Sequence, residues 1–185
     1  MSEPKPNEDL PLYPSYECPH PQVAAHAKHI AEVVFFLFNQ LPAFNCVPSL
    51  LIESALALEL FLKSLHSRTV STRDHNAIDI EVYALTAVPI VFGHDLVKLY
   101  DKLPVGVKSN LDSAYSSKVV NSDKHPLREC LGKYKSLFID MWYVFENAGV
   151  EGIGSINSLV SLVEFFHNYV GGMQREVYFS VPDSG

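Results

Sequence analysis

Apolar residues recur every three or four positions along most of this chain, which is the spacing of amphipathic helices. Proline supports two of the helix boundaries. Pro42 disfavours helical geometry in the residue before it, and Pro48 suits a first helical turn. The predicted fold class is therefore all-α, an up-and-down helical bundle. We expect about six helices, at residues 22–41, 48–66, 93–103, 105–120, 126–147 and 155–170.

The second predicted helix is apolar on nearly its whole circumference, with leucines on every side between residues 50 and 65. A helix of this kind is usually buried on several sides. We expect it to be the central helix of the bundle or one half of a dimer interface. Because its apolar surface is wider than one bundle seam, the sequence predicts a homodimer.

Two regions depart from the helical period. Residues 67–77 are polar and predict a loop. Ile78–Tyr83 then alternates apolar and polar positions, which is typical of a half-buried strand. Both a short hairpin and an irregular packed insertion fit residues 78–92. Near the end of the chain, Glu176–Val181 fits a short closing strand.

Six of the 12 prolines lie in the first 21 residues. Proline has a fixed φ and no backbone N–H, so residues 1–21 are predicted to be an extended or disordered arm. We expect residues 1–20 to be dispensable for folding because they have little to bury. The predicted organisation is this arm, one helical domain over residues 22–170, and a tail over residues 171–185.

The chain has 185 residues, about the length of one domain, and a formal net charge of -7. Such an acidic chain is unsuited to coating nucleic acid non-specifically, because that mode of binding depends on neutralising phosphates. A local basic patch is compatible with this charge. Its candidate residues are Lys98, Lys102, Lys133 and Lys135.

The three cysteines have no CxxC spacing, which favours reduced thiols. The residues after Met1 are acidic and rich in proline, unlike a signal peptide. The apolar run Val33–Phe38 is far shorter than the roughly 20 residues that span a membrane. We therefore expect a cytoplasmic protein that does not interact with membranes.

The sequence contains no glycine-rich phosphate-binding motif and no HExxH motif. His26 and His29 are close enough in sequence to share a metal, but no third ligand follows at a suitable spacing. We therefore predict neither a cofactor nor a metal. Glu59 and Lys63 form a favourable i, i+4 pair on the apolar second helix. Asp95 stands where an acidic residue suits the start of a helix.

Three segments together resemble bacterial members of the HEPN superfamily. They are Ala55–Lys63 (ALALELFLK), Gly93–Tyr100 (GHDLVKLY) and Phe138–Glu146 (FIDMWYVFE). The resemblance implies a helical bundle that commonly forms homodimers and acts in RNA cleavage, toxin–antitoxin or phage-defence systems, or nucleotide binding. The segments supply the candidate residues of a ligand or partner cleft, which are Glu59, Lys63, His94, Asp95, Lys98, Trp142, Tyr143 and Glu146.

The sequence departs from the catalytic members of that family. Those members carry an Arg and a His, separated by four to six residues, on a late helix. Here Arg68 and His75 are the one formal match, and they lie in the predicted loop after the second helix. This chain also has Trp142 before Tyr143, where related sequences often have an Arg that would hold a phosphate. We therefore expect the standard RNase pair to be missing.

Three functions are consistent with these observations. The first is a HEPN-like homodimer that binds RNA, a nucleotide or a protein partner in stress or defence. The second is a metal-independent RNase that uses Arg68 and His75. The third is a helical interaction module that binds a partner helix. The placement of the cations discriminates between them, because a nucleic-acid cleft must gather them into one patch.

Overall fold

The fold is known from a computed structural model, which describes residues 15–42, 46–74, 82–118, 125–135, 137, 155–174 and 176–179. Helices predominate in this part of the chain, as the sequence predicts. They are α1 (Pro21–Gln40), α2 (Val47–Ser64), α3 (Leu96–Asp101), α4 (Val105–Lys118), α5 (Leu127–Gly132) and α7 (Ile156–Gly172). Four strands accompany them: β1 (Ser15–Cys18), β2 (Ser67–Asp74), β3 (Val82–Pro89) and β4 (Glu176–Phe179).

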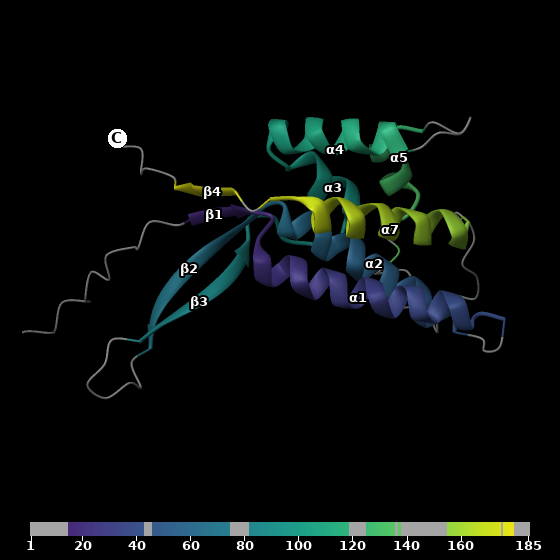
Figure 1. The fold of residues 1–185 in the computed structure, drawn as a ribbon, viewed down its shortest axis with the longest axis horizontal. Helices are drawn as coiled ribbons and strands as arrows, with labels where there is room; N and C mark the ends of the chain where they lie inside the picture. Colours follow the sequence, from purple (N-terminus) through teal and green to yellow (C-terminus); the bar gives the residue numbers. More distant parts are fainter. Residues whose placement is uncertain are drawn as a thin grey trace, which may run out of the picture.

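The helix α2 is the centre of the bundle. It packs against α1, α3 and α7, and most of its residues from Leu50 to Ser64 are buried (Figure 1). On α1, Ala24, Ala27 and Ala31 recur at helical spacing and are buried. Such small residues let neighbouring helices approach closely. The predicted central helix is confirmed. Because its own chain covers it, its apolar circumference gives no reason to expect a dimer.

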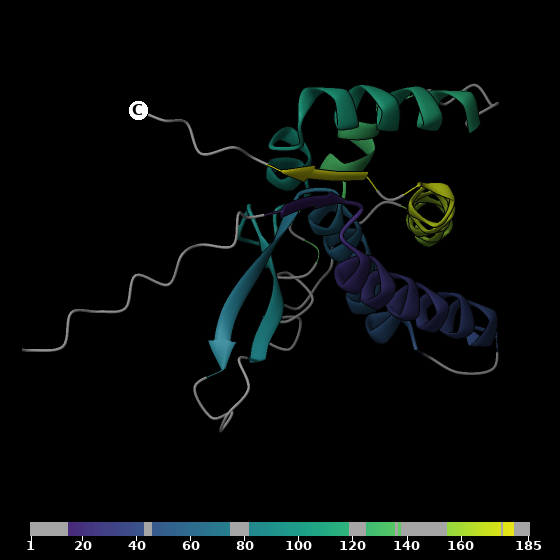
Figure 2. The same ribbon diagram turned by 60° about the vertical axis from the view of Figure 1, so that its left-hand side comes forward.

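A second layer of helices lies over this core. The helices α3 and α5 pack together, and α4 lies outside them as the outermost helix (Figure 2). Buried leucines hold the layers together, including Leu99 of α3, Leu111 of α4 and Leu131 of α5. The helix predicted for 126–147 ends as α5 at Gly132. The remainder of that segment lies almost wholly outside the described residues.

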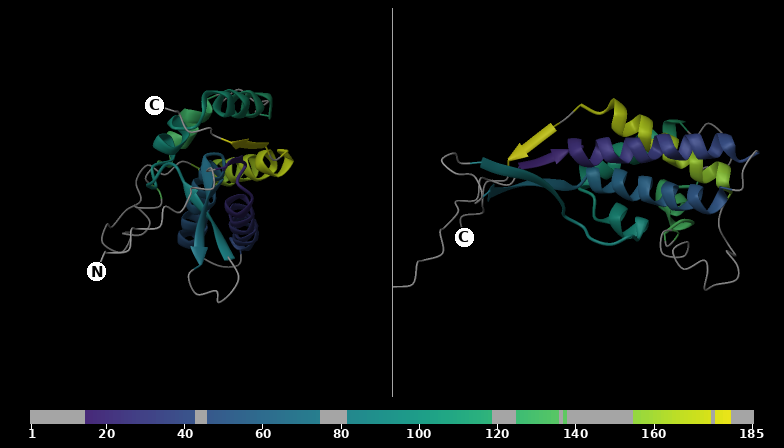
Figure 3. Two further views of the ribbon diagram at one scale, coloured as in Figure 1. Left: turned by 90° about the vertical axis from the view of Figure 1, so that its left-hand side faces the viewer. Right: turned by 90° about the horizontal axis from the view of Figure 1, so that it is seen from below.

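The strands form one antiparallel sheet in the order β3-β2-β1-β4. The sheet lies at one end of the bundle, where β2 and β3 extend beyond the helices (Figure 3). A hairpin is confirmed, with β3 inside the predicted range of 78–92 and β2 before it, and so is a strand near the end of the chain. Of the strand predicted at Ile78–Tyr83, residues 78–81 lie outside the described residues. The loop predicted for residues 67–77 is wrong for Ser67–Asp74. That polar segment is a strand because β1 and β3 pair with its backbone on either side.

The described part of the predicted N-terminal arm is an ordered element of the fold. Ser15–Cys18 is extended, as predicted, but it forms β1 and pairs with both β2 and β4. Cys18, Pro19 and His20 are buried, and the backbone N–H of His20 donates to the carbonyl of Ser64 at 2.7 Å. The expectation that this segment has little to bury is therefore wrong for residues 18–20.

None of the helices in the described residues combines the length and the apolar character that crossing a membrane requires. In the same part of the chain, His26 and His29 are exposed on α1. No group of three or more potential metal ligands gathers there.

Candidate functional site

A buried carboxylate joins α2 to the segment that precedes α3. Glu59 is only 3% exposed although it carries a charge. Each of its oxygens has its own partner. Lys63, one turn later on α2, donates to Oε1, and Nδ1 of His94 lies 2.8 Å from Oε2. Burial of a carboxylate is costly unless it is paired and hydrogen-bonded, and these two partners meet that need.

The turn before α3 places His94 over Glu59. Gly93 has a φ of 109°, which a residue with a side chain rarely adopts. Since a carboxylate only accepts hydrogen bonds, the Nδ1 of His94 carries the hydrogen in this contact. The imidazole ring is thereby held in one orientation and one tautomer. Its side chain stays about half exposed.

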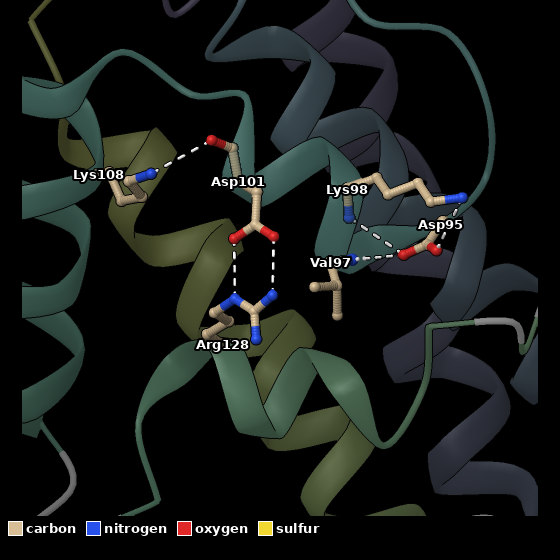
Figure 4. A network of polar contacts seen from close by, with 6 residues as sticks. All are labelled: Asp95, Val97, Lys98, Asp101, Lys108 and Arg128. Carbon is tan, nitrogen blue, oxygen red and sulfur yellow. Dashed lines mark hydrogen bonds and ion pairs between the residues drawn. The ribbon is translucent and has the colours of Figure 1, made fainter.

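Asp95 caps the short helix α3. Its Oδ1 accepts hydrogen bonds from the backbone N–H groups of Val97 at 3.0 Å and Lys98 at 3.1 Å (Figure 4). This is the usual role of an aspartate at an N-cap. The ammonium of Lys98 lies 3.7 Å from Oδ2 of Asp95 while its side chain stays 80% exposed. The cap therefore places a solvent-facing cation one turn beyond His94.

The other end of α3 is tied to α5 and α4. Arg128 donates two hydrogen bonds of 2.8 Å to the carboxylate of Asp101, and Lys108 donates to the Asp101 carbonyl at 3.2 Å (Figure 4). The Arg128 guanidinium lowers the pKa of Asp101. Nearby, the buried Tyr100 donates to Asp112, and burial raises the pKa of its phenol. These contacts hold α3 in place and thus fix the loop that carries His94.

An exposed aromatic side chain stands beside this cluster. Phe92 is 78% exposed and lies two residues before His94. Lys102, at the end of α3, is also exposed, and its backbone interacts with His66 at the end of α2. Burial lowers the pKa of the His66 imidazole. Sequence reasoning missed Phe92. The sequence feature that could have indicated it is a large apolar residue directly before the Gly-His-Asp turn.

The structure brings together five of the predicted site residues, Glu59, Lys63, His94, Asp95 and Lys98. Arg68 is exposed on β2, where it pairs in register with Tyr16 and Val88. Its predicted catalytic partner, His75, lies outside the described residues. So do Trp142, Tyr143 and Glu146.

Comparison of the chain with protein-family models, with curated proteins and with solved structures finds no match. The HEPN resemblance therefore stays a prediction from the sequence segments quoted above. The evidence for a function is therefore the geometry of the site.

Proposed function

We propose that this protein is a HEPN-like homodimeric helical protein that binds single-stranded RNA, without cleaving it, in a stress or defence context. The binding surface is the site between α2 and α3. One observation carries the proposal: the 78% exposed ring of Phe92 lies two residues before His94, whose imidazole is held by Glu59, and six residues before the exposed Lys98.

Single-stranded RNA exposes unstacked bases, and proteins that bind it stack those bases on aromatic side chains. A phenylalanine ring left largely in water keeps apolar surface that a ligand can bury. Phe92 offers such a ring within a turn that Gly93 and the capped helix α3 define. A base stacked on this ring would remove its apolar surface from water.

The same turn supplies charge for the RNA backbone. Lys98 and Lys102 are exposed on and after α3. The carboxylate of Glu59 is buried beneath Lys63 and His94, so it faces the protein and not an approaching phosphate. Lys98 and Lys102 are two of the four lysines predicted for a basic patch, and both are exposed.

The homodimer and the biological context rest on the sequence resemblance alone. A specific dimer interface buries at least about 1,000 Å². Because α2 is covered within its own chain, that interface must use another surface. Light scattering at micromolar concentration tests this part, and a single species with the mass of one chain would refute it.

The alternative is a metal-independent RNase, favoured by the contact between Glu59 and His94. A carboxylate that accepts from Nδ1 leaves Nε2 as the basic nitrogen of a neutral imidazole, which suits general acid–base chemistry. The state of the RNA after incubation distinguishes binding without cleavage from this alternative. RNA incubated with the protein stays intact in the first case and is cut in the second.

Fluorescence anisotropy with a short labelled single-stranded RNA tests the binding proposal. We expect saturable binding that weakens as salt rises, because phosphate contacts release counterions. Phe92→Ala should weaken it between about fivefold and 150-fold, since one base stack contributes about 1–3 kcal/mol. The matched control is Phe36→Ala, which removes a ring on α1 that is 63% exposed. The proposal fails if wild-type protein does not bind or if the two variants lose affinity equally.

A further inference from the structure

The helices α4, α5 and α7 border an open hollow that is separate from the site between α2 and α3. It has a volume of about 570 Å³ and lies among α4, α5 and α7. Ligand sites in proteins typically range over about 300–1,000 Å³ and combine apolar walls with a few polar groups. The hollow therefore has the size of a small-molecule site, and the chemistry of its lining indicates what it would bind.

Aromatic rings form its apolar wall. Tyr115 of α4 meets Phe165 of α7 edge to face with ring centres 5.0 Å apart. The hydroxyl of Tyr115 donates to Sγ of Cys130 at 3.2 Å, and that of Tyr134 donates to the Ser155 carbonyl at 3.1 Å. With both hydroxyl hydrogens used within the protein, the rings are held in place. A fixed aromatic wall favours a ligand that is itself planar and aromatic.

Neutral polar side chains from α7 form another part of the lining. Asn157, Ser161 and Asn168 recur at helical spacing, so they line the hollow along one stripe of the helix. Within the described residues, none of these three side chains makes a hydrogen bond. They offer donors and acceptors to the polar groups of a ligand.

Two lysines give the hollow a positive character. Lys118 is the last residue of α4, and Lys133 follows α5 as its C-cap. Neither forms an ion pair among the described residues, and together they outnumber Glu164, the one carboxylate in the described lining. Two lysines, from the ends of two different helices, that line one open hollow favour an anionic group there.

We propose that this hollow binds a small anion built on a planar aromatic ring. The ring packs against Tyr115, Tyr134 and Phe165, and the carboxylate or phosphate of the ligand lies near Lys118 and Lys133. The amides and hydroxyl of the α7 stripe bind the remaining polar atoms. This site is independent of the RNA surface, which uses Phe92, a residue that does not line the hollow.

Isothermal titration calorimetry on the full chain tests the site with three probes: adenosine monophosphate, 4-hydroxybenzoate and inorganic phosphate. We expect saturable binding of at least one aromatic anion and weaker binding of phosphate, because phosphate has no ring. Binding of the nucleotide alone identifies a phosphate-bearing ligand, and binding of the benzoate alone identifies an aromatic acid. The proposal is overturned if neither aromatic anion binds or if phosphate binds as tightly as they do.

Two variants locate the binding. Lys133→Met should weaken it about tenfold, the loss expected for one charge-assisted contact. Lys135→Met is the matched control, because this neighbouring lysine is exposed and does not line the hollow. An independent readout is alkylation of Cys130 by iodoacetamide, which a bound ligand should slow. Equal affinity in the two variants, or alkylation unchanged by a saturating ligand, would refute the site even if the α2–α3 surface still binds RNA.

Discussion

Nδ1 of His94 lies 2.8 Å from Oε2 of Glu59, although the two residues are 35 positions apart in the chain. This contact joins the central helix α2 to the turn before α3. It also completes the hydrogen bonding of a buried carboxylate, whose other oxygen pairs with Lys63. One contact therefore serves the stability of the core and the orientation of the proposed RNA surface.

Removal of the Glu59 carboxylate should destabilise the protein strongly. Glu59→Ala leaves Lys63 partly buried without its carboxylate, and breaking a buried pair in this way costs about 3–5 kcal/mol. Chemical denaturation measures the loss. Glu32→Ala, which removes an exposed glutamate on α1, should change stability by no more than about 0.5 kcal/mol. A loss below about 1 kcal/mol for Glu59→Ala would show that the pair contributes little.

The acidic titration of Asp101 should depend on Arg128. The guanidinium lowers the pKa of this carboxyl in the folded chain, so the contact stabilises the protein above the unfolded pKa of 3.8. That contribution is lost as pH falls through the folded pKa. Arg128→Met should let the pKa rise toward its ordinary value, which carboxyl NMR titration detects. An unchanged pKa in that variant would contradict the assignment.

Stability should also fall in mildly acidic solution because of His66. Burial lowers its pKa in the folded state below the unfolded value of 6.5, so the unfolded chain binds protons more readily. Stability is therefore complete above pH 6.5 and decreases as pH falls through the folded pKa. Denaturation midpoints should be measured above pH 6.5 and below the folded pKa of His66. The difference between the two midpoints should be smaller in His66→Gln than in the wild type. His29→Gln, at an exposed position on α1, should behave as the wild type does.

Truncation should distinguish two parts of the N-terminal arm. Deletion of residues 1–20 removes β1 from between β2 and β4 and exposes the surface that Cys18 and His20 cover. The melting temperature should fall by roughly 10 °C or more, since about 3 kcal/mol or more is lost. Deletion of residues 1–14 leaves β1 intact and should lower the melting temperature by a few degrees at most. Equal melting temperatures for the two truncated chains would contradict a structural role for β1.

RNA cleavage above background is not expected. A metal-independent RNase needs a titrating group and a cation held within about 0.5 Å of their working positions. Arg68 is exposed on β2, and the sequence has Trp142 at the position where HEPN members often have an arginine. Single-turnover assays with a structured RNA should therefore show the same background for wild-type protein, His75→Ala and His94→Ala. Cleavage that disappears in His75→Ala with the fold intact would establish the standard RNase pair, and loss in His94→Ala alone would assign the chemistry to the Glu59–His94 pair.

The sequence by itself determined the helical bundle and its central helix. Helical spacing and proline positions predicted α1, α2, α4 and α7 to within a few residues, because these signals act between neighbours along the chain. The i, i+4 pair of Glu59 and Lys63 was visible for the same reason. Asp95 was also placed at a helix start from sequence alone, although its side-chain cap became visible only in the structure.

Contacts between distant residues were decided by the tertiary structure. Ser67–Asp74 looks like a polar loop because its strand conformation depends on hydrogen bonds from β1 and β3, which composition does not report. The exposure of Phe92 depends on how the turn at Gly93 directs it away from the core. The partnership of His94 with Glu59, and the hollow among α4, α5 and α7, exist only because packing brings separate helices together.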